Sequence, residues 1–168
     1  MMMATGFPRA LALLLIDLTL ASASANAAYP LTEGQARATI APFYRALNAT
    51  AGDEVRALVV QATSADWVSC SGNDTCRPRD QVVGGIASLH QAIPDLNWEI
   101  KEVLVAGDRA IVRGEASGTP SGEFMGVSHA GKAFKVMSID VHTIAGGKMV
   151  RSYHVEDWIG ATRQLGAK

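Results

Sequence analysis

The chain has 168 residues, 48% of them hydrophobic and 18% charged, which predicts one compact domain and argues against a disordered tail, a fibre or a multidomain assembly. Its 15 basic and 16 acidic side chains give a formal net charge of −1, so no broad field would attract nucleic acid or an anionic membrane. A small neutral ligand is the better expectation.

The N-terminal segment has the pattern of a secretory signal peptide. Arg9 precedes an apolar run, and small residues follow, with Ala-Asn-Ala at residues 25–27 as an A-x-A cleavage site. The apolar run of about 12 residues is shorter than the roughly 20 that a membrane-spanning helix needs. We therefore expect residues 1–27 to be a signal peptide and residues 28–168 to be a secreted or periplasmic domain with no membrane association. The alternative is an ordinary buried N-terminal helix.

Three helices are expected in the first half of the domain: residues 32–48, 53–62 and 79–92. Thr32 can cap the first helix, whose apolar positions recur at i, i+3 and i+4. Pro94 stops the third helix. A strand-like segment, residues 66–70, lies between the second and third helices.

Cys70 and Cys76 enclose a turn-forming Ser-Gly-Asn-Asp-Thr segment. An oxidising compartment closes such a pair, so we predict a disulfide that stabilises one loop by about 2 kcal/mol. A metal site is the poorer interpretation, because neither the spacing nor the neighbours resemble C-x-x-C or a Cys/His set. A reduced, buried pair is the remaining alternative.

From residue 97 the sequence alternates with the period of strands. Expected strands are residues 98–106, 109–117, 132–144 and 148–156, followed by a short helix from Asp157. Turns at Gly107-Asp108 and Gly146-Gly147 would join them into two hairpins. Helices followed by antiparallel strands predict an α+β domain, with the helices on one face of a strongly curved sheet and a cone-shaped cavity between them.

The second hairpin carries most of the polar residues. A two-residue turn places Ala145 opposite Lys148, and an uninterrupted ladder then puts five polar side chains on one face: Asp140, His142, Arg151, Tyr153 and Asp157. The other face would carry Ser152, His154 and Glu156 among apolar residues. If the first face is concave, it forms a polar cluster in an apolar cup; the alternative is a charged face in solvent.

This row suits proton transfer. Desolvation raises the pKa of a cavity carboxyl and Arg151 would lower it, so Asp157 is the candidate acid/base. His142 or Tyr153 could hydrogen bond an enolate oxygen. His142 and His154 fall on opposite faces in this register, and no phosphate-binding motif occurs, so we expect no metal and no cofactor.

Several motifs resemble those of one known family. The run from Gly147 to Gly160, with the Gln-Leu-Gly that follows, resembles the C-terminal signature of SnoaL-like polyketide cyclases, or ester cyclases. Ile-Pro-Asp-Leu at 93–96 is similar to the family's Phe-Pro-Asp-Leu, and the 118–126 loop, which contains Phe124, is similar to its Gly-Thr-His-x-Gly-x-Phe-x-Gly. The ordered series covers most of the chain from about residue 53 to residue 166.

The resemblance implies a nuclear transport factor 2-like cone with a deep pocket, no metal or nucleotide, and a homodimer. In the family, the Asp after the last strand is the acid/base of a cofactor-free aldol condensation that closes a ring on a polyketide ester. Asp157 occupies that position, and His142 is the nearest counterpart of an assisting pocket His. The expected substrate-binding residues are Asp140, Arg151, Tyr153, Trp67 and Phe124.

The leading hypothesis is therefore an exported cyclase, isomerase or lyase that acts on a small apolar or polyketide-like substrate through Asp157. One alternative is an exported protein that binds an apolar metabolite without catalysis. Another is an epoxide or ester hydrolase with an Asp-activated water.

Overall fold

The computed structural model describes residues 30–128 and 131–166, so the expected signal peptide lies outside the described residues. The helices are α1 (Glu33–Ala46), α2 (Gly52–Ala62), α3 (Arg79–Ala92) and α4 (Trp158–Leu165). The strands are β1 (Thr63–Cys70), β2 (Cys76–Pro78), β3 (Asn97–Ala106), β4 (Arg109–Gly118), β5 (Phe134–Ala145) and β6 (Lys148–Glu156). The expected α+β class and the order of the expected elements are confirmed; β2 was not expected as a strand.

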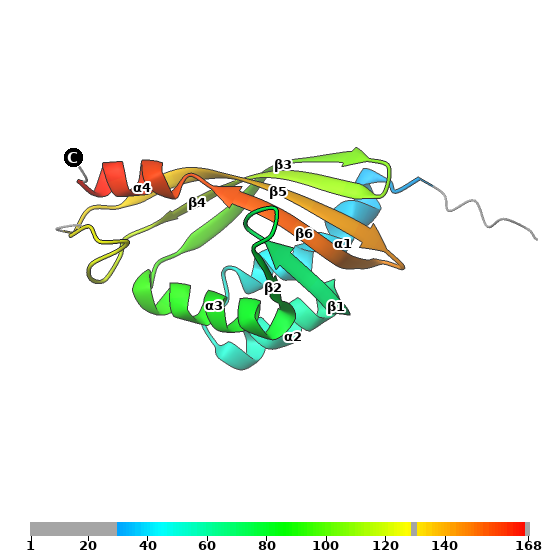
Figure 1. Cartoon of the computed structure of the whole chain (residues 1–168), viewed down its shortest axis with the longest axis horizontal. Helices are drawn as coiled ribbons and strands as arrows, with labels where there is room; N and C mark the ends of the chain where they lie inside the picture. The colour runs from blue at the N-terminus through cyan, green and yellow to red at the C-terminus, as the bar shows by residue number, and fades with distance from the viewer. Residues whose placement is uncertain (1–29, 129–130, 167–168) are drawn as a thin grey trace, which may run out of the picture.

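One curved sheet forms the back of the molecule. Its strand order is β2-β1-β6-β5-β4-β3, and the sheet arches over α1, α2 and α3, whereas α4 lies near one end of β5 (Figure 1). All neighbouring strands are antiparallel except β1 and β6, which are parallel. The antiparallel strands expected from residue 97 onward are confirmed, and the parallel pairing of β1 with β6 was not predicted, because hairpin patterns detect only local pairing.

Local signals set the helix ends. Thr32 Oγ1 accepts a hydrogen bond from the Gln35 backbone N–H at 3.2 Å, and Gln35 Oε1 accepts from the Thr32 N–H at 2.9 Å. This reciprocal pair is a capping box, and it confirms Thr32 as the predicted N-cap of the first helix. The apolar stripe of α1, including Ile40 and Phe43, is buried in the core that α1 shares with the sheet.

A one-residue irregularity changes the register of the β5–β6 hairpin. Next to the turn, Ala145 pairs with Lys148 and Ile144 with Met149, as expected. Beyond that point Val150 is an extra residue on β6, and Thr143 pairs with Arg151. A bulge of this kind moves every later residue of the strand to the opposite face from the one an uninterrupted ladder predicts.

The corrected pairs are Ser138 with Glu156, Asp140 with His154, and His142 with Ser152. The predicted row of five polar residues was therefore wrong for β6. Asp140 and His142 do lie on the face that α1 to α3 cover, but their partners are Ser152, His154 and Glu156.

Candidate functional site

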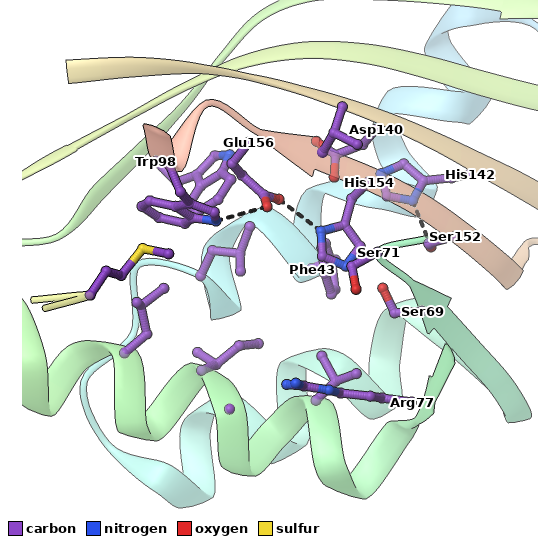
Figure 2. A pocket seen from close by; sticks show the side chains of 18 of the residues that line it. Phe43, Ser69, Ser71, Arg77, Trp98, Asp140, His142, Ser152, His154 and Glu156 are labelled. Carbon is purple, nitrogen blue, oxygen red and sulfur yellow. Dashed lines mark hydrogen bonds and ion pairs between the residues drawn. The ribbon is translucent and has the colours of Figure 1, made fainter. Parts of the chain in front are cut away.

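A cavity of about 560 Å³ lies between the sheet and helices α1 and α3. Its apolar lining comes mainly from the helices and the 118–126 loop: Phe43, Leu47, Val82, Ile86, Leu89, Phe124 and Met125. Its polar lining comes from the strands: Ser69, Ser71, Arg77, Asp140, His142, Ser152, His154 and Glu156. Figure 2 shows the polar side chains of β5 and β6 pointing toward the helices across this space. The size suits a small organic molecule.

A chain of hydrogen bonds runs behind the polar wall. Tyr44 Oη donates to Asp140 Oδ2 at 3.0 Å and lies 3.1 Å from His142 Nε2. His142 Nδ1 lies 2.8 Å from Ser152 Oγ, and Ser152 Oγ accepts a bond from Trp67 Nε1 at 3.0 Å. All five side chains are buried, so the chain is held in one arrangement.

Burial determines which side chains in this series of hydrogen bonds are protonated. Desolvation lowers the pKa of His142 to about 3, so its ring is neutral. Desolvation, followed by the charge of Asp140, raises the pKa of Tyr44 well above its ordinary value, so the phenol keeps its proton. One set of protons satisfies every atom: Ser152 donates to His142 Nδ1, His142 Nε2 donates to Tyr44, and Tyr44 donates to Asp140.

Asp140 is a buried carboxyl that titrates near neutrality. Desolvation raises its pKa from 3.8 to about 7, and the charge of Glu156 adds to the increase. The Tyr44 hydrogen bond and the charge of His154 act in the opposite direction. A carboxyl with this pKa can both accept and return a proton at neutral pH.

His154 and Glu156 form a second polar group on β6. His154 Nδ1 lies 2.8 Å from Glu156 Oε1, and Trp158 Nε1 donates to Glu156 Oε2 at 3.1 Å. The hydrogen bond that Glu156 accepts from His154 raises the pKa of His154, against a smaller desolvation effect. Since Nδ1 is engaged with Glu156, Nε2 is the ring nitrogen left to face the cavity (Figure 2).

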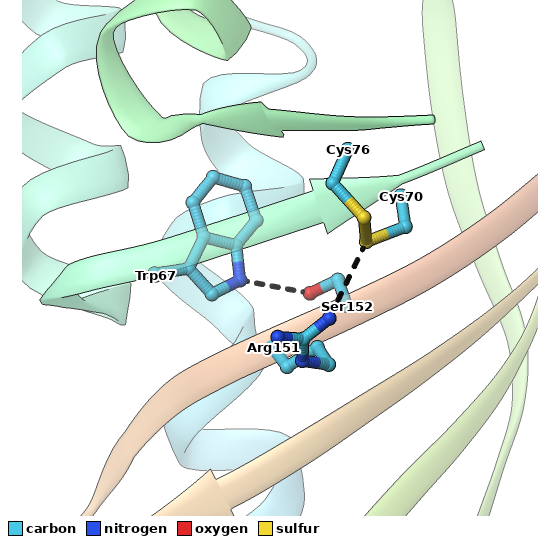
Figure 3. The surroundings of a disulfide bond; sticks show 5 residues. All are labelled: Trp67, Cys70, Cys76, Arg151 and Ser152. Atoms are coloured by element: carbon cyan, nitrogen blue, oxygen red, sulfur yellow. Dashed lines mark hydrogen bonds between the residues drawn. A yellow bond between two sulfur atoms is a disulfide. The ribbon is translucent and has the colours of Figure 1, made fainter. Parts of the chain in front are cut away.

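The structure does not bring Arg151 and Tyr153 into the cavity. Both are exposed on the opposite face of β6, where the Arg151 guanidinium lies 5.9 Å from the centre of the Tyr153 ring. Arg151 Nη1 also lies 3.8 Å from Cys70 Sγ (Figure 3). Their expected place in the substrate pocket was wrong because the Val150 bulge reverses the alternation of β6.

Asp157 is likewise outside the cavity lining. Its side chain is exposed and accepts a hydrogen bond from the Gly160 backbone N–H at 2.8 Å. Asp157 is thus the N-cap of α4, and the structure separates it from Asp140 and His142. The expectation that it extends the polar row was wrong for the same reason as for Arg151.

The two aromatic residues expected to bind substrate have different positions. Phe124 lines the cavity and packs on Phe134 and Trp158, with ring centres 6.0 and 5.8 Å away. Trp67 is 1% exposed, packs on Phe43 and does not line the cavity. Its role in the site is indirect, through its hydrogen bond to Ser152 (Figure 3).

The Cys70–Cys76 disulfide is confirmed, with an S–S distance of 2.07 Å. It joins β1 to β2 at the edge of the sheet. The neighbouring strand pair, Ser69 and Arg77, lines the cavity. The part of the chain that the structure describes holds no group of three or more His, Cys, Asp or Glu side chains placed to bind a metal ion. None of its helices combines the length and the apolar character that a membrane span requires.

Sequence reasoning missed four residues of this site as functional groups: Tyr44, Arg77, His154 and Glu156. Tyr44 falls within the apolar pattern of the first expected helix, so the sequence did not distinguish it from a core residue. The i, i+2 spacing of His154 and Glu156 does place them on one face of a strand, which is a usable signal. The sequence offered no mark of which face that would be.

Comparisons with known proteins agree with this architecture. The chain matches a family model described as SnoaL-like polyketide cyclase over residues 37–165. No curated protein matches it. TsrD from Streptomyces laurentii is similar in structure, with a TM-score of 0.69 and 23% identity, over 82% of this chain and 99% of that one.

Two further solved structures are similar. Wild-type IdmH from Streptomyces antibioticus, a proposed polyketide cyclase, has a TM-score of 0.66 and 25% identity over 77% of this chain and 97% of its own. A hypothetical protein with a ketosteroid isomerase-like fold from Catenulispora acidiphila, solved with trimethylamine, has a TM-score of 0.62 and 16% identity, over 77% and 93%. These likenesses show the cone-shaped fold.

Proposed function

This chain belongs to the SnoaL-like polyketide cyclase family, and from that premise we propose that it catalyses cofactor-free proton transfer on an apolar small molecule in a cyclase or isomerase reaction. The observation that carries the proposal is Asp140, a carboxyl at the cavity wall whose pKa burial raises to about 7. Asp140 takes the acid/base role in place of Asp157, whose side chain is committed to α4.

Asp140 and His154 are directly opposed residues of β5 and β6. Opposed residues on one face of an antiparallel pair have Cβ atoms about 5 Å apart, so both side chains can reach one substrate atom and its neighbour. In the proposed reaction, ionised Asp140 removes a proton from a carbon next to a carbonyl group. His154, whose pKa its hydrogen bond to Glu156 raises, is protonated on both ring nitrogens in this step and donates from Nε2 to the enolate oxygen that develops.

Ring closure follows if the same molecule carries a second carbonyl group. The enolate carbon attacks that carbonyl carbon, a carbon–carbon bond forms, and the resulting alkoxide takes back the proton that Asp140 holds. Tyr44 and His142 do not need to change protonation in this sequence. They hold the Asp140 carboxyl through the buried hydrogen-bond chain, which supports its orientation toward the cavity.

The first half of this reaction can be tested without the natural substrate. The bicyclic ketone 2-tetralone has an acidic C–H group, and nuclear magnetic resonance detects the exchange of that hydrogen in D₂O at neutral pH. We expect the wild-type protein to accelerate exchange and Asp140→Asn to reduce the acceleration by about 100-fold or more. Asn keeps the size of Asp and can accept the Tyr44 hydrogen bond.

Asp157→Asn is the matched control, because Asn is also a good N-cap residue and the variant preserves α4. It should exchange 2-tetralone at the wild-type rate. Loss of activity in Asp157→Asn with retention in Asp140→Asn would reverse the assignment. No acceleration by the wild-type protein would contradict the proposed proton transfer.

We also propose that the chain is exported and forms a homodimer. The disulfide is compatible with an oxidising compartment, and removal of residues 1–27 would appear in the intact mass of protein purified from its host.

An apolar row crosses the outer face of the sheet and supports the dimer: Leu104, Ile111, Val141 and Tyr153. A Val141→Glu variant should be monomeric in light scattering where the wild type is dimeric; a wild-type monomer would contradict this.

A further inference from the structure

A row of polar side chains crosses four strands on the cavity face and ends in a cation. The strand register pairs Arg77 with Ser69, Ser69 with Ser152, and Ser152 with His142. All four residues line the cavity. The row begins in the buried hydrogen-bond chain at β5 and ends at the edge strand β2 with the Arg77 guanidinium.

The Arg77 guanidinium is available to a ligand. It makes no hydrogen bond and no ion pair with any residue that the structure describes. Its Nη1 lies 4.0 Å from the point that a Cβ atom on Gly85 would occupy, so it extends along α3 where that helix has no side chain. In Figure 2, Arg77 lies along α3, with Ser69 and Ser71 between it and His154.

The serines beside Arg77 are also without partners. The Ser69 side chain is 6% exposed and lines the cavity, and neither its hydroxyl nor that of Ser71 bonds to another described residue. The Cys70–Cys76 disulfide closes the loop that carries these residues, so β2 stays paired with β1. Ser69, which is buried, and Ser71 and Arg77, which are exposed, therefore line the cavity at the edge of the sheet that the disulfide joins.

We propose that Arg77, Ser69 and Ser71 bind a carboxylate group of the substrate, and that the substrate is an apolar carboxylic acid. This inference rests on the proposed function, because it assigns a substrate class to the same cavity. A guanidinium matches the planar geometry of a carboxylate with two parallel hydrogen bonds, and the hydroxyls can donate to the remaining lone pairs. Leu47, Ile86 and Phe124 provide the apolar surface for the body of the molecule.

The spacing of the strands sets the length of such a substrate. β2 lies two strands from β6 and three from β5, which corresponds to roughly 10 and 14 Å along the sheet. A carboxylate at Arg77 would therefore leave the far end of a fused-ring or extended molecule beside Asp140 and His154. The acid binds at the disulfide edge, and proton transfer takes place at the centre of the sheet.

The test compares two probes that differ in charge and hardly in shape, 2-naphthoic acid and 2-naphthamide. Binding is measured by titration calorimetry at neutral pH with the disulfide intact. We expect the wild-type protein to bind the acid at least about tenfold more tightly than the amide, which is the low end for a charge-assisted hydrogen bond. Arg77→Gln should lower the affinity for the acid much more than the affinity for the amide, so that the preference is lost.

Arg109→Gln is the charge control, because Arg109 is the first residue of β4, next to the β3–β4 turn, and does not line the cavity. It should retain the preference for the acid. Equal affinity for the two probes in the wild type, no binding of either, or a preference that survives Arg77→Gln would each overturn the proposal. The proposed function has a separate test. If Asp140→Asn catalysed hydrogen exchange on 2-tetralone as fast as the wild type, the role of Asp140 would be contradicted, but the preference for the acid would be unaffected.

Discussion

The two faces of β6 differ in burial and in hydrogen bonding, although their residues alternate along the same strand. The cavity face carries Ser152, His154 and Glu156, and the outer face carries Arg151 and Tyr153. On the cavity face, each polar group has a fixed hydrogen-bond partner. On the outer face, Tyr153 is 39% exposed. Neighbouring residues thus acquire different chemistry from burial alone, and the extra residue Val150 decides which set is buried.

The sharpest test of this contrast substitutes one residue on each face of β6 and compares the two variants. His154→Ala removes the proposed donor to the enolate and should slow hydrogen exchange on 2-tetralone by about 100-fold or more. Tyr153→Phe, one position earlier, changes the outer face only, and this variant should catalyse hydrogen exchange on 2-tetralone at the wild-type rate. Similar losses in the two variants would mean that the faces do not differ in function.

Asp140 tests the energetic consequence of the cavity face. Its pKa rises from 3.8 in the unfolded chain to about 7 in the folded protein, so the folded state retains a proton that the unfolded state releases. The contribution of this group to the free energy of unfolding is therefore greatest below about pH 4 and is lost as the pH rises through about 7.

Asp140→Asn removes this titration. In urea unfolding, the variant should gain stability relative to the wild type between pH 4 and pH 8, by on the order of 4 kcal/mol from the linkage of about 1.4 kcal/mol per pKa unit. A difference between variant and wild type that stays constant over this pH range would show that burial does not perturb the Asp140 carboxyl.

Ser152 and Arg151 provide a comparison by stability. Ser152→Ala leaves Trp67 Nε1 and His142 Nδ1 buried without a partner, which should reduce the free energy of unfolding by about 2–4 kcal/mol. Arg151→Ala removes an exposed side chain and should change it by about 0.5 kcal/mol. Urea unfolding at one pH measures both changes. A larger loss of stability in Arg151→Ala would mean that the outer face of β6 contributes more to stability than the cavity face.

The smallest expected effect concerns the end of β6. Asp157→Ala removes the cap of α4 and should reduce stability by about 1 kcal/mol, whereas Asp157→Asn should have almost no effect. Proton exchange on 2-tetralone should be unchanged in both variants. A large loss of exchange in the alanine variant without a loss of helix, measured by circular dichroism, would indicate that Asp157 has a chemical role.

Much of the fold followed from local signals. Thr32 predicted the first helix start, Pro94 the end of the third helix, and the Gly146-Gly147 turn the first two pairs of the last hairpin. The closure of Cys70 and Cys76 also followed from their spacing and the turn residues between them. Each of these signals acts within a few residues, so it needs no knowledge of the rest of the chain.

The candidate site followed from the sequence only in part. Asp140 and His142 lie in the polar cluster as predicted, and the family match over residues 37–165 agrees with the motifs that indicated it. Tyr44 could not be found in this way, because it meets Asp140 across 96 residues of chain. Arg77 reaches the cavity only because β2 joins the edge of the sheet.

The sequence by itself thus determined the class of fold, the helix ends, the disulfide and one strand of the polar wall, because these depend on local propensity and on the alternation next to a turn. Only the tertiary structure decided which face of β6 is buried, because a bulge of one residue reverses that alternation and nothing local encodes it. The pKa of Asp140 and the position of Arg77 were decided at the same level, since burial and the parallel pairing of β1 with β6 exist only once distant segments have packed together.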